Sequence, residues 1–231
     1  MKLLILAAGV GRRIGKDSNH LPKCLLKFKS TTIIDRLIFQ FKKYVKDITI
    51  VTGYKSDVLF NLYGNKYKCI FYKDYHKTNN LHTLWHVRDV LDQDTIISFA
   101  DVVVEDKIIE MIVNDRNNFS LLIDTSKIRD GTMFVANKDN LLKSITSTDK
   151  KEATGNFIGI SKIKKIFLKN FISAMSEIIN ESNNYYYTMA LNNMIKKKLK
   201  INTIDVSGKF WTEVDENSDY KKLLLEEKNI L

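Results

Sequence analysis

The sequence is poor in the residues that mark disulfide-stapled, metal-clustered or membrane-spanning proteins. Its 231 residues include two cysteines, four histidines and one proline. Cys24 and Cys69 lack the spacing of metal ligands, and a reducing compartment would leave them as small buried or half-buried thiols. No apolar run approaches the ~20 residues that a membrane-spanning helix needs, and no secretory signal pattern opens the chain. We therefore expect a cytoplasmic protein with no membrane partner.

The positive charge of the chain does not by itself select a partner. The formal net charge is +10 at pH 7, which would suit nucleic acid, a membrane surface or a small anion. The one dense run of lysines, at residues 196–200, is typical of a solvated helix end. Basic and aromatic residues do not alternate as they do on single-strand-binding surfaces, so we expect no nucleic-acid partner. No pattern in the sequence indicates an oligomeric state.

The first hundred residues alternate between short apolar runs and amphipathic segments. Thr32 and Asp35 form a capping-box-like start for a helix at 33–45, and further helices are expected at 55–64 and 79–91. The expected strands cover residues 2–6, 48–54, 68–72 and 95–100. This alternation with short loops predicts an α/β fold with a doubly wound, mainly parallel sheet.

The second half of the chain has a different pattern. Closely spaced strands are expected at 120–124, 131–137, 141–146 and 155–163, followed by helices at 164–180 and 185–199. A last strand at 201–206 and a helix from about Glu216 follow them. Because no Gly/Ser linker or repeat separates the halves, we expect a single domain over 1–231, with halves of about 1–105 and 106–231 and a small inserted β or lid region.

The loop after the first strand has the composition of a phosphate-binding loop. Gly9 and Gly11 let the backbone approach a ligand closely, and Arg12, Arg13 and Lys16 add positive charge. In open α/β sheets, ligands bind at the carboxyl ends of the strands, where this loop lies. The Walker A pattern and the Rossmann fingerprint both require spacings that residues 9–16 do not have.

The stretch LAAGVGRRIG, followed by the only proline and a lysine, resembles the signature of nucleotidyltransferases that activate sugar phosphates and phospho-alcohols. The matching residues are Leu6, Ala7, Ala8, Gly9, Gly11, Arg13, Pro22 and Lys23. The departure is Arg12, where the family usually has serine or threonine. TNNLHTLW at 78–85 and VDENSDY at 214–220 are similar to segments of the CTP-dependent branch, represented by phosphocholine cytidylyltransferase. The resemblance implies a Rossmann-like, glycosyltransferase-A-like fold.

The resemblance also implies a reaction and its residues. An anionic oxygen of a small phosphorylated acceptor would attack the α-phosphorus of CTP and release pyrophosphate. Asp101 and Asp215 would bind Mg²⁺, while Lys23 and Arg13 would act on the phosphates as catalytic residues. Residues 1–105 would bind the nucleotide and residues 106–231 the acceptor. The nucleotide-binding positions would be Leu6, Ala7, Ala8, Gly9, Gly11, Arg12, Lys16, Gly53, Tyr54, Asn80 and Ala100.

One helix late in the sequence narrows the range of acceptors that we expect. Where choline-activating relatives have aromatic and acidic residues, this chain has Ala190, Leu191 and Asn192. We therefore expect phosphoglutamine, phosphoethanolamine or 2-aminoethylphosphonate types rather than phosphocholine, in bacterial capsule or surface-glycan modification. The expected acceptor-binding residues are Arg129, Lys162 and Asn192.

Two alternatives remain open at this point. A sugar-1-phosphate nucleotidyltransferase that uses UTP or dTTP would share the fold and the metal site. A non-catalytic, positively charged nucleotide or RNA binder would share only the charge. Either aspartate could, taken alone, be a turn or helix-cap residue, so the metal site depends on Asp101 and Asp215 lying together.

Overall fold

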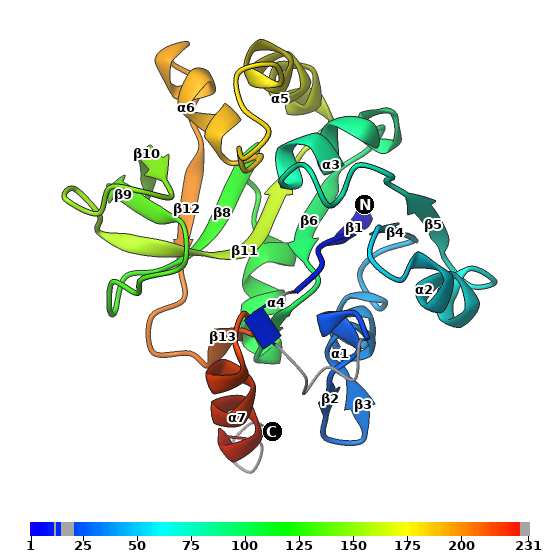
Figure 1. Cartoon of the computed structure of the whole chain (residues 1–231). Coiled ribbons are helices and arrows are strands. Elements are labelled where there is room, and N and C mark those ends of the chain that lie inside the picture. Colours follow the sequence, from blue (N-terminus) through cyan, green and yellow to red (C-terminus); the bar gives the residue numbers. More distant parts are fainter. Residues whose placement is uncertain (12, 15–20, 227–231) are drawn as a thin grey trace.

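One large sheet runs through both halves of the protein (Figure 1). The computed structural model describes residues 1–11, 13–14 and 21–226. Within them, the sheet contains β1 (Lys2–Ala7), β4 (Asp47–Thr52), β5 (Lys68–Phe71), β6 (Thr95–Phe99), β8 (Phe119–Asp124), β9 (Phe134–Lys138), β10 (Leu141–Thr146), β11 (Gly155–Ile163) and β12 (Asn202–Asp205). The spatial order is β5-β4-β1-β6-β11-β8-β12-β10-β9.

The strand directions differ between the two halves. β5, β4, β1 and β6 are mutually parallel, as the strand-helix alternation predicts. β11 runs antiparallel to both β6 and β8, and β10 runs antiparallel to both β12 and β9. The sheet is therefore mixed in the second half, where the closely spaced strands have no crossover helix between them.

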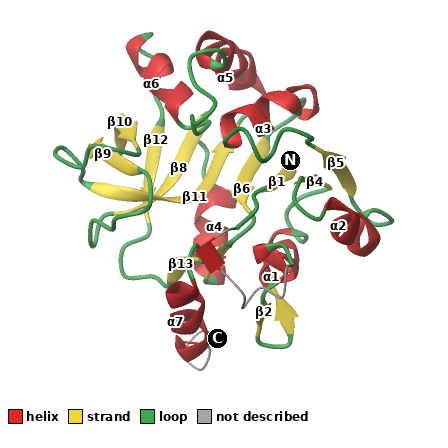
Figure 2. Ribbon diagram, in the orientation of Figure 1, coloured by secondary structure: helices red, strands yellow, loops and turns green. Residues whose placement is uncertain are grey.

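Helices cover both faces of this sheet (Figure 2). They are α1 (Ile33–Phe41), α2 (Ser56–Tyr63), α3 (Asn80–His86), α4 (Asp106–Asn114), α5 (Lys165–Ile178) and α6 (Met189–Lys196), with short 3₁₀ turns η2 (Lys23–Leu25) and η3 (Arg88–Val90). The last helix, α7 (Asn217–Glu226), instead packs against the short strand at Trp211–Glu213. Successive residues of β1 point to opposite faces. Leu3 and Ile5 join the core under α1 and α4, whereas Leu4 and Leu6 join the core under α3, α5 and α6.

The ends of several helices are set by hydrogen bonds of side chains rather than by the hydrophobic periodicity of the sequence. The predicted cap at Thr32 is confirmed, since its Oγ1 accepts a hydrogen bond from the Asp35 backbone N–H at 3.2 Å. The helix predicted at 185–199 begins later, at Met189. Its expected first turn is held by Asn80, whose Oδ1 accepts from the Tyr187 backbone N–H at 2.8 Å. The helix predicted at 79–91 ends at His86 and continues as η3.

Two small ladders complete the fold. β2 (Lys27–Phe28) pairs with β3 (Thr31–Thr32), and β7 (Val102–Val104) pairs antiparallel with β13 (Trp211–Glu213). The second pairing brings a segment near the end of the chain to the carboxyl end of β6. Three-residue strands are too short to show alternation in the sequence, so neither β7 nor β13 was expected. In the described part of the chain, no helix has the length and apolar character needed to span a bilayer.

Candidate active site

A cavity of about 560 Å³ opens at the carboxyl ends of β1 and β6. The end of β1 and the loop after it supply one wall through Leu6, Ala7, Ala8, Gly9 and Gly11, and Phe99 to Asp101 supply the floor. Thr132, Met133 and other residues of the second half form the opposite wall. The cavity therefore lies where the parallel strands end and where both halves of the chain meet, which is the usual ligand position in such sheets.

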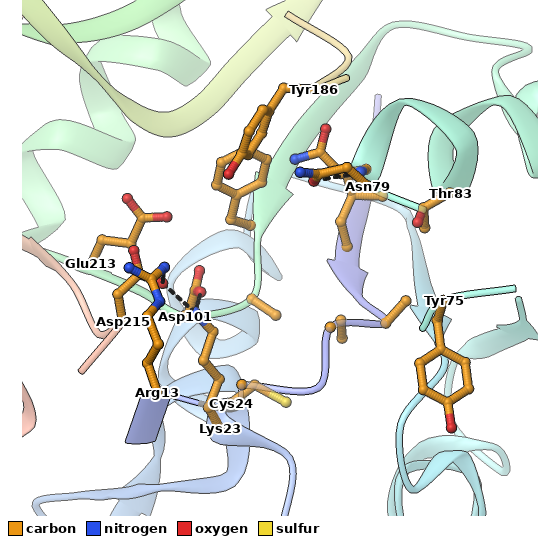
Figure 3. A pocket seen from close by; sticks show the side chains of 18 of the residues that line it. Arg13, Lys23, Cys24, Tyr75, Asn79, Thr83, Asp101, Tyr186, Glu213 and Asp215 are labelled. Atoms are coloured by element: carbon orange, nitrogen blue, oxygen red, sulfur yellow. Dashed lines mark hydrogen bonds and ion pairs between the residues drawn. The ribbon is translucent and has the colours of Figure 1, made fainter. Parts of the chain in front are cut away.

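Four charged residues, which we call the charged cluster, lie together in this cavity (Figure 3). The ammonium of Lys23 contacts the carboxylate of Asp101 and lies 2.7 Å from Oδ1 of Asp215. Nη2 of Arg13 lies 3.2 Å from the same Asp215 oxygen. Lys23 and Asp101 are mostly buried, whereas more than half of the Arg13 side chain is exposed. The structure thus brings together the two expected catalytic residues, Arg13 and Lys23, and the two expected metal ligands, Asp101 and Asp215.

Short pieces of backbone hold the charged cluster in place. Asp101 lies two residues beyond the end of β6 and directly before β7, and its carbonyl oxygen accepts the backbone N–H of Val214 at 3.0 Å. This bond extends the β7–β13 ladder and sets Asp215 beside Asp101. Pro22 precedes η2, and its carbonyl accepts the N–H of Leu25 at 2.8 Å, which orients Lys23 at the start of the turn. Residues 192 positions apart in the sequence become neighbours in this way.

The electrostatics of the charged cluster favour a charged lysine. Burial alone would lower the pKa of Lys23, but Asp101 and Asp215 raise it above its ordinary value. A third carboxylate, Glu213, is also close, and its pKa is raised well above the ordinary value by burial and by Asp101 and Asp215. Burial and the two aspartates therefore favour the neutral form of Glu213, while Lys23 and Arg13 balance the charges of Asp101 and Asp215.

The carboxylates fit a divalent cation. Asp101, Glu213 and Asp215 can each offer one oxygen, and these oxygens lie within 4.8 Å of one another. Oδ1 of Asp101 is buried and has no hydrogen-bond partner among the described residues. Buried carboxylate oxygens without a partner are rare, and hard cations such as Mg²⁺ take oxygen ligands of this type. Glu213 was missed at the sequence level, although its spacing of two from Asp215 along an extended segment predicts a shared face.

The predicted nucleotide loop lines the cavity, with two residues lying behind it. Leu6, Ala7, Ala8, Gly9, Gly11, Asn80 and Ala100 all contribute to the lining. Gly53 and Tyr54 support the loop instead, because the Tyr54 backbone N–H donates to the Ala8 carbonyl at 3.1 Å. Gly11 has a φ of +63°, a left-handed conformation that glycine adopts without the strain that a Cβ would cause. Arg12 and Lys16 lie outside the described residues.

Cys24 lines the same cavity but is not suited to act as a nucleophile. It is buried beside the charged cluster, and burial together with the charge of Asp101 raises the pKa of its thiol to about 12. The thiol therefore stays protonated at neutral pH, and a thiolate is the reactive form of cysteine.

The three predicted acceptor-binding residues lie in different places. Arg129 lines a second cavity of about 210 Å³ beside the first. Lys162 lies at the far end of β11, which runs antiparallel to β6, and its ammonium is bound by the carbonyls of Val113 and Asp115 at 2.7 Å. Asn192 hydrogen-bonds both backbone groups of Ile145, at 2.8 and 3.0 Å. Neither Lys162 nor Asn192 contributes to the lining of these two cavities.

Further lining residues were not predicted individually. Thr78, Asn79 and Thr83, in and just before α3, line the cavity together with Tyr75 and Tyr186. Figure 3 shows Asn79, Thr83 and Tyr186. Oδ1 of Asn79 accepts the N–H of Asn80 at 2.7 Å and so caps α3. The segment TNNLHTLW was singled out as a unit, but its spacing did not show which side chains face a ligand.

Known proteins are similar to this chain in sequence and in fold. Residues 3–110 match the MobA-like NTP transferase domain. The chain is 29% identical to the CTP:phosphoglutamine cytidylyltransferase of Campylobacter jejuni, over 95% of this chain and 97% of that protein. It is 23% identical to the CMP-5'-(3-aminopropyl)phosphonate synthase of Streptomyces rubellomurinus, of whose length it spans 38%. The solved CTP:phosphocholine cytidylyltransferase of Streptococcus pneumoniae matches with a TM-score of 0.79 and 22% identity, over 97% of both chains.

These similarities agree with the resemblance seen in the first loop and with the doubly wound α/β sheet. The matched domain covers the β1 loop, Lys23 and Asp101, while the alignments with whole relatives extend beyond Asp215. Residues 3–110 are therefore similar to a MobA-like NTP transferase domain, and over nearly its whole length the chain is similar in sequence to cytidylyltransferases and has the Rossmann-like α/β fold of solved nucleotidyltransferases.

Proposed function

We propose that the protein is a CTP-dependent cytidylyltransferase that joins CMP to a small phosphorylated or phosphonate acceptor and releases pyrophosphate. The observation that carries this proposal is the charged cluster, set at the floor of a cavity between the predicted nucleotide loop and the second half. The two relatives reported above support the choice of CTP, because both are named for the transfer or attachment of a cytidine nucleotide.

The proposed reaction needs positioning and charge neutralisation more than proton transfer. The attacking phosphate or phosphonate oxygen is already an anion near neutral pH, so the reaction needs no general base. The barrier comes from repulsion between two anions and from charge that develops on the α-phosphoryl oxygens and on pyrophosphate. Lys23 lies where it can neutralise the α-phosphate and the incoming anion. Arg13, which is more exposed, can bind the outer phosphates with its planar fork of N–H groups.

The carboxylates have a second role in this proposal. Asp101, Glu213 and Asp215 would hold Mg²⁺, which when bound supplies positive charge to the phosphates. In the absence of a cation, Lys23 partly neutralises Asp101 and Asp215, so the chain itself keeps the aspartates in place.

For the acceptor, we propose phosphoglutamine-, phosphoethanolamine- or aminoalkylphosphonate-type compounds in preference to phosphocholine. The residues of α6 that replace the aromatic and acidic positions of choline-activating relatives support this choice, since Ala190 and Leu191 are fully buried in the core. A role in capsule or surface-glycan modification, and a cytoplasmic location, are parts of the same proposal.

The test is a matrix of nucleotides against acceptors in a coupled assay for pyrophosphate release with Mg²⁺. We expect CTP to support turnover, and UTP and dTTP to support little. We expect an amine-bearing or carboxylate-bearing phosphate to exceed phosphocholine. Turnover with a sugar 1-phosphate and UTP or dTTP would instead assign the alternative nucleotidyltransferase activity, and no release in any combination would contradict the proposal.

The nucleotide loop offers a matched pair of glycine variants. An alanine Cβ at Gly53 would lie 2.5 Å from the Ala8 carbonyl oxygen and 2.6 Å from Cβ of Tyr75, whereas one at Gly9 would meet nothing within 4 Å. We expect Gly53→Ala to lower the free energy of unfolding by about 1–3 kcal/mol, because the loop must shift. Gly9→Ala should unfold like wild type but raise the KM for CTP. Urea unfolding and steady-state kinetics separate the two effects, and equal unfolding midpoints would contradict the need for glycine at position 53.

A further inference from the structure

A second cavity, of about 210 Å³, lies next to the charged cluster and has no role in the proposed attack on CTP. It shares Arg13, Glu213 and Asp215 with the main cavity, so the two spaces meet at the predicted site of phosphate chemistry. Its other walls include Arg129, from the loop between β8 and β9, and Trp211 of β13. A molecule whose phosphate lies at the charged cluster can therefore extend into this cavity.

Arg129 is fixed in this cavity on both its backbone and its side chain. The guanidinium lies over the Trp211 ring, 4.5 Å from the ring centroid, in cation–π geometry. Its Nη2 lies 3.3 Å from Oδ2 of Asp124. The backbone N–H of Arg129 donates to Oδ1 of Asn156 at 2.7 Å, and Nδ2 of Asn156 donates to the Arg129 carbonyl at 3.0 Å. Asn156 is fully buried, so this anchor belongs to the core of the sheet.

The carboxylate of Asp124, which orients Arg129, is itself held by hydrogen bonds from Trp211 and Ser126. Its Oδ2 accepts Nε1 of Trp211 at 2.7 Å, and its Oδ1 accepts the N–H and the hydroxyl of Ser126 at 2.9 and 2.6 Å. Its carboxylate is only 3% exposed, so it cannot turn toward a ligand. The Trp211 ring and the Asp124 carboxylate together fix the plane of the Arg129 guanidinium. A fixed plane is what the guanidinium needs to bind another planar group in a defined orientation.

Most of the guanidinium's hydrogen-bonding capacity is unused. An arginine has five N–H donors, and within the described residues only the contact with Asp124 engages those of Arg129. The Arg129 side chain is 41% exposed, although the face of its guanidinium that lies against the Trp211 ring is covered. An edge with parallel N–H groups that lines a cavity matches a carboxylate or a phosphate, which it can bind in bidentate fashion.

The surrounding charges favour a carboxylate over a second phosphate. Asp130, Glu216 and Asp219 line the same cavity and would repel a dianionic phosphate more strongly than a singly charged carboxylate. The carboxylate of Asp219 already accepts the Glu216 N–H at 2.9 Å, and Asp130 pairs with Lys150 at 2.9 Å. These acidic groups also suit an ammonium close to the carboxylate. The cavity therefore fits the carboxylate end of an amino acid.

We infer that Arg129 binds a carboxylate of the acceptor and makes the enzyme selective for phosphorylated acceptors of the amino-acid type. This inference rests on the proposed transferase function and names its acceptor class. Arg129 is the specificity-determining contact, while Asp124 and Trp211 are positioning residues that act through it.

The test compares acceptors that differ by one carboxylate. O-Phosphoserine and O-phosphoethanolamine form one such pair, and 2-amino-4-phosphonobutyrate and 3-aminopropylphosphonate form a second pair with a longer spacing. We expect the wild-type kcat/KM to favour the carboxylated member of at least one pair by about 10- to 100-fold, as for a hydrogen-bonded charge pair. Arg129→Gln should bring this ratio close to one, mainly through the KM of the carboxylated acceptor.

Two further variants separate specificity from structure. Asp124→Asn keeps the shape but removes the charge that orients the guanidinium, so it should lower the same ratio, and the Asp124→Asn/Arg129→Gln double variant should lower it no further. Arg88 is the matched control, because it stacks on Trp85 at 4.5 Å and donates to the Trp85 carbonyl at 2.9 Å, but lines neither cavity. Arg88→Gln should leave the ratio unchanged.

A binding measurement keeps the inference testable if no acceptor is turned over. Trp85 and Trp211 are the only tryptophans, so a Trp85→Phe background isolates the emission of the ring that carries Arg129. With CMP present, O-phosphoserine or 2-amino-4-phosphonobutyrate should change this emission at lower concentration than its carboxylate-free partner, and Arg129→Gln should abolish the difference. Absence of pyrophosphate release with every acceptor would reject the proposed function. The inference itself is overturned if both members of each pair behave alike, or if Arg129→Gln weakens both equally.

Discussion

Replacing Lys23 by methionine is expected to reduce pyrophosphate release by about 10²–10³-fold, as the loss of one preorganised charged donor at a reacting centre does. The ammonium contacts Asp101 and Asp215 and stays charged, because those carboxylates raise its pKa despite burial. A methionine fills a similar volume but supplies no charge to the α-phosphate or to the incoming anion. Single-turnover measurements with saturating CTP would show the loss in the chemical step rather than in binding.

The same substitution should also destabilise the fold. Removing one partner of a buried ion pair costs about 3–5 kcal/mol, and the Lys23 side chain is 19% exposed, so we expect a smaller loss of about 1–3 kcal/mol. The Lys23→Met/Asp215→Asn double variant removes, together with the lysine, one of the two carboxylate charges that Lys23→Met leaves without a partner. It should recover part of the unfolding free energy without recovering activity, which separates stability from catalysis.

An exposed lysine provides the control for this pair of effects. Lys27 lies four residues further on, in β2, and its side chain is solvent-exposed. Lys27→Met should change neither the unfolding midpoint nor pyrophosphate release measurably. If Lys23→Met kept more than about a tenth of wild-type activity in a folded protein, Lys23 would not be the principal cation of the site.

The second large effect is expected at the two aspartates. Asp101→Asn and Asp215→Asn should each lower kcat/KM by about 10³-fold or more, equivalent to about 4 kcal/mol of transition-state stabilisation. Both carboxylates belong to the set that fits a divalent cation, and both orient Lys23. The fold should be retained, because asparagine keeps the shape and the backbone bond from Val214 to the Asp101 carbonyl needs no carboxylate.

A surface aspartate and a binding assay make this prediction specific. Asp92 pairs with Lys2 but is 62% exposed and lines neither cavity, so Asp92→Asn should leave kcat/KM unchanged. A non-catalytic nucleotide or RNA binder would tolerate Asp101→Asn and Asp215→Asn without loss of its binding. Normal pyrophosphate release by either variant, with circular dichroism like that of wild type, would remove the metal assignment.

Much of the fold could be predicted because the strands and helices follow simple hydrophobic periods. β11 spans Gly155–Ile163, the same residues that the apolar run predicts, and the cap at Thr32 is where the capping box indicates it. The short strands β7 and β13 were not predicted, since three residues carry no period. The start of α6 was displaced because a side chain on α3, that of Asn80, binds the backbone ahead of it.

The position of Asp101 could be predicted because it depends on topology rather than on orientation, whereas that of Asp215 was implied only by the family resemblance, since it depends on the unpredicted pairing of β13 with β7. Asp101 follows a strand that lies beside β1, so it had to reach the same sheet edge as the glycine loop. Lys162 could not be placed in this way, because whether β11 is parallel or antiparallel to its neighbours is set by partners distant in the sequence. Antiparallel pairing puts Lys162 opposite Ile96, near the start of β6, and so at the wrong edge for a ligand.

The contribution of β13 has a consequence for biosynthesis. In the folded protein Asp215 lies beside Asp101 because β13 pairs with β7, and the same strand brings Trp211 under Arg129. A nascent chain that has left the ribosome up to Lys209 therefore carries the glycine loop, Lys23 and Asp101. It still lacks Asp215, which completes the charged cluster. Catalytic competence should be acquired in a single late step of synthesis, and a protease that trims the chain back past β13 should silence the enzyme while sparing most of the central sheet.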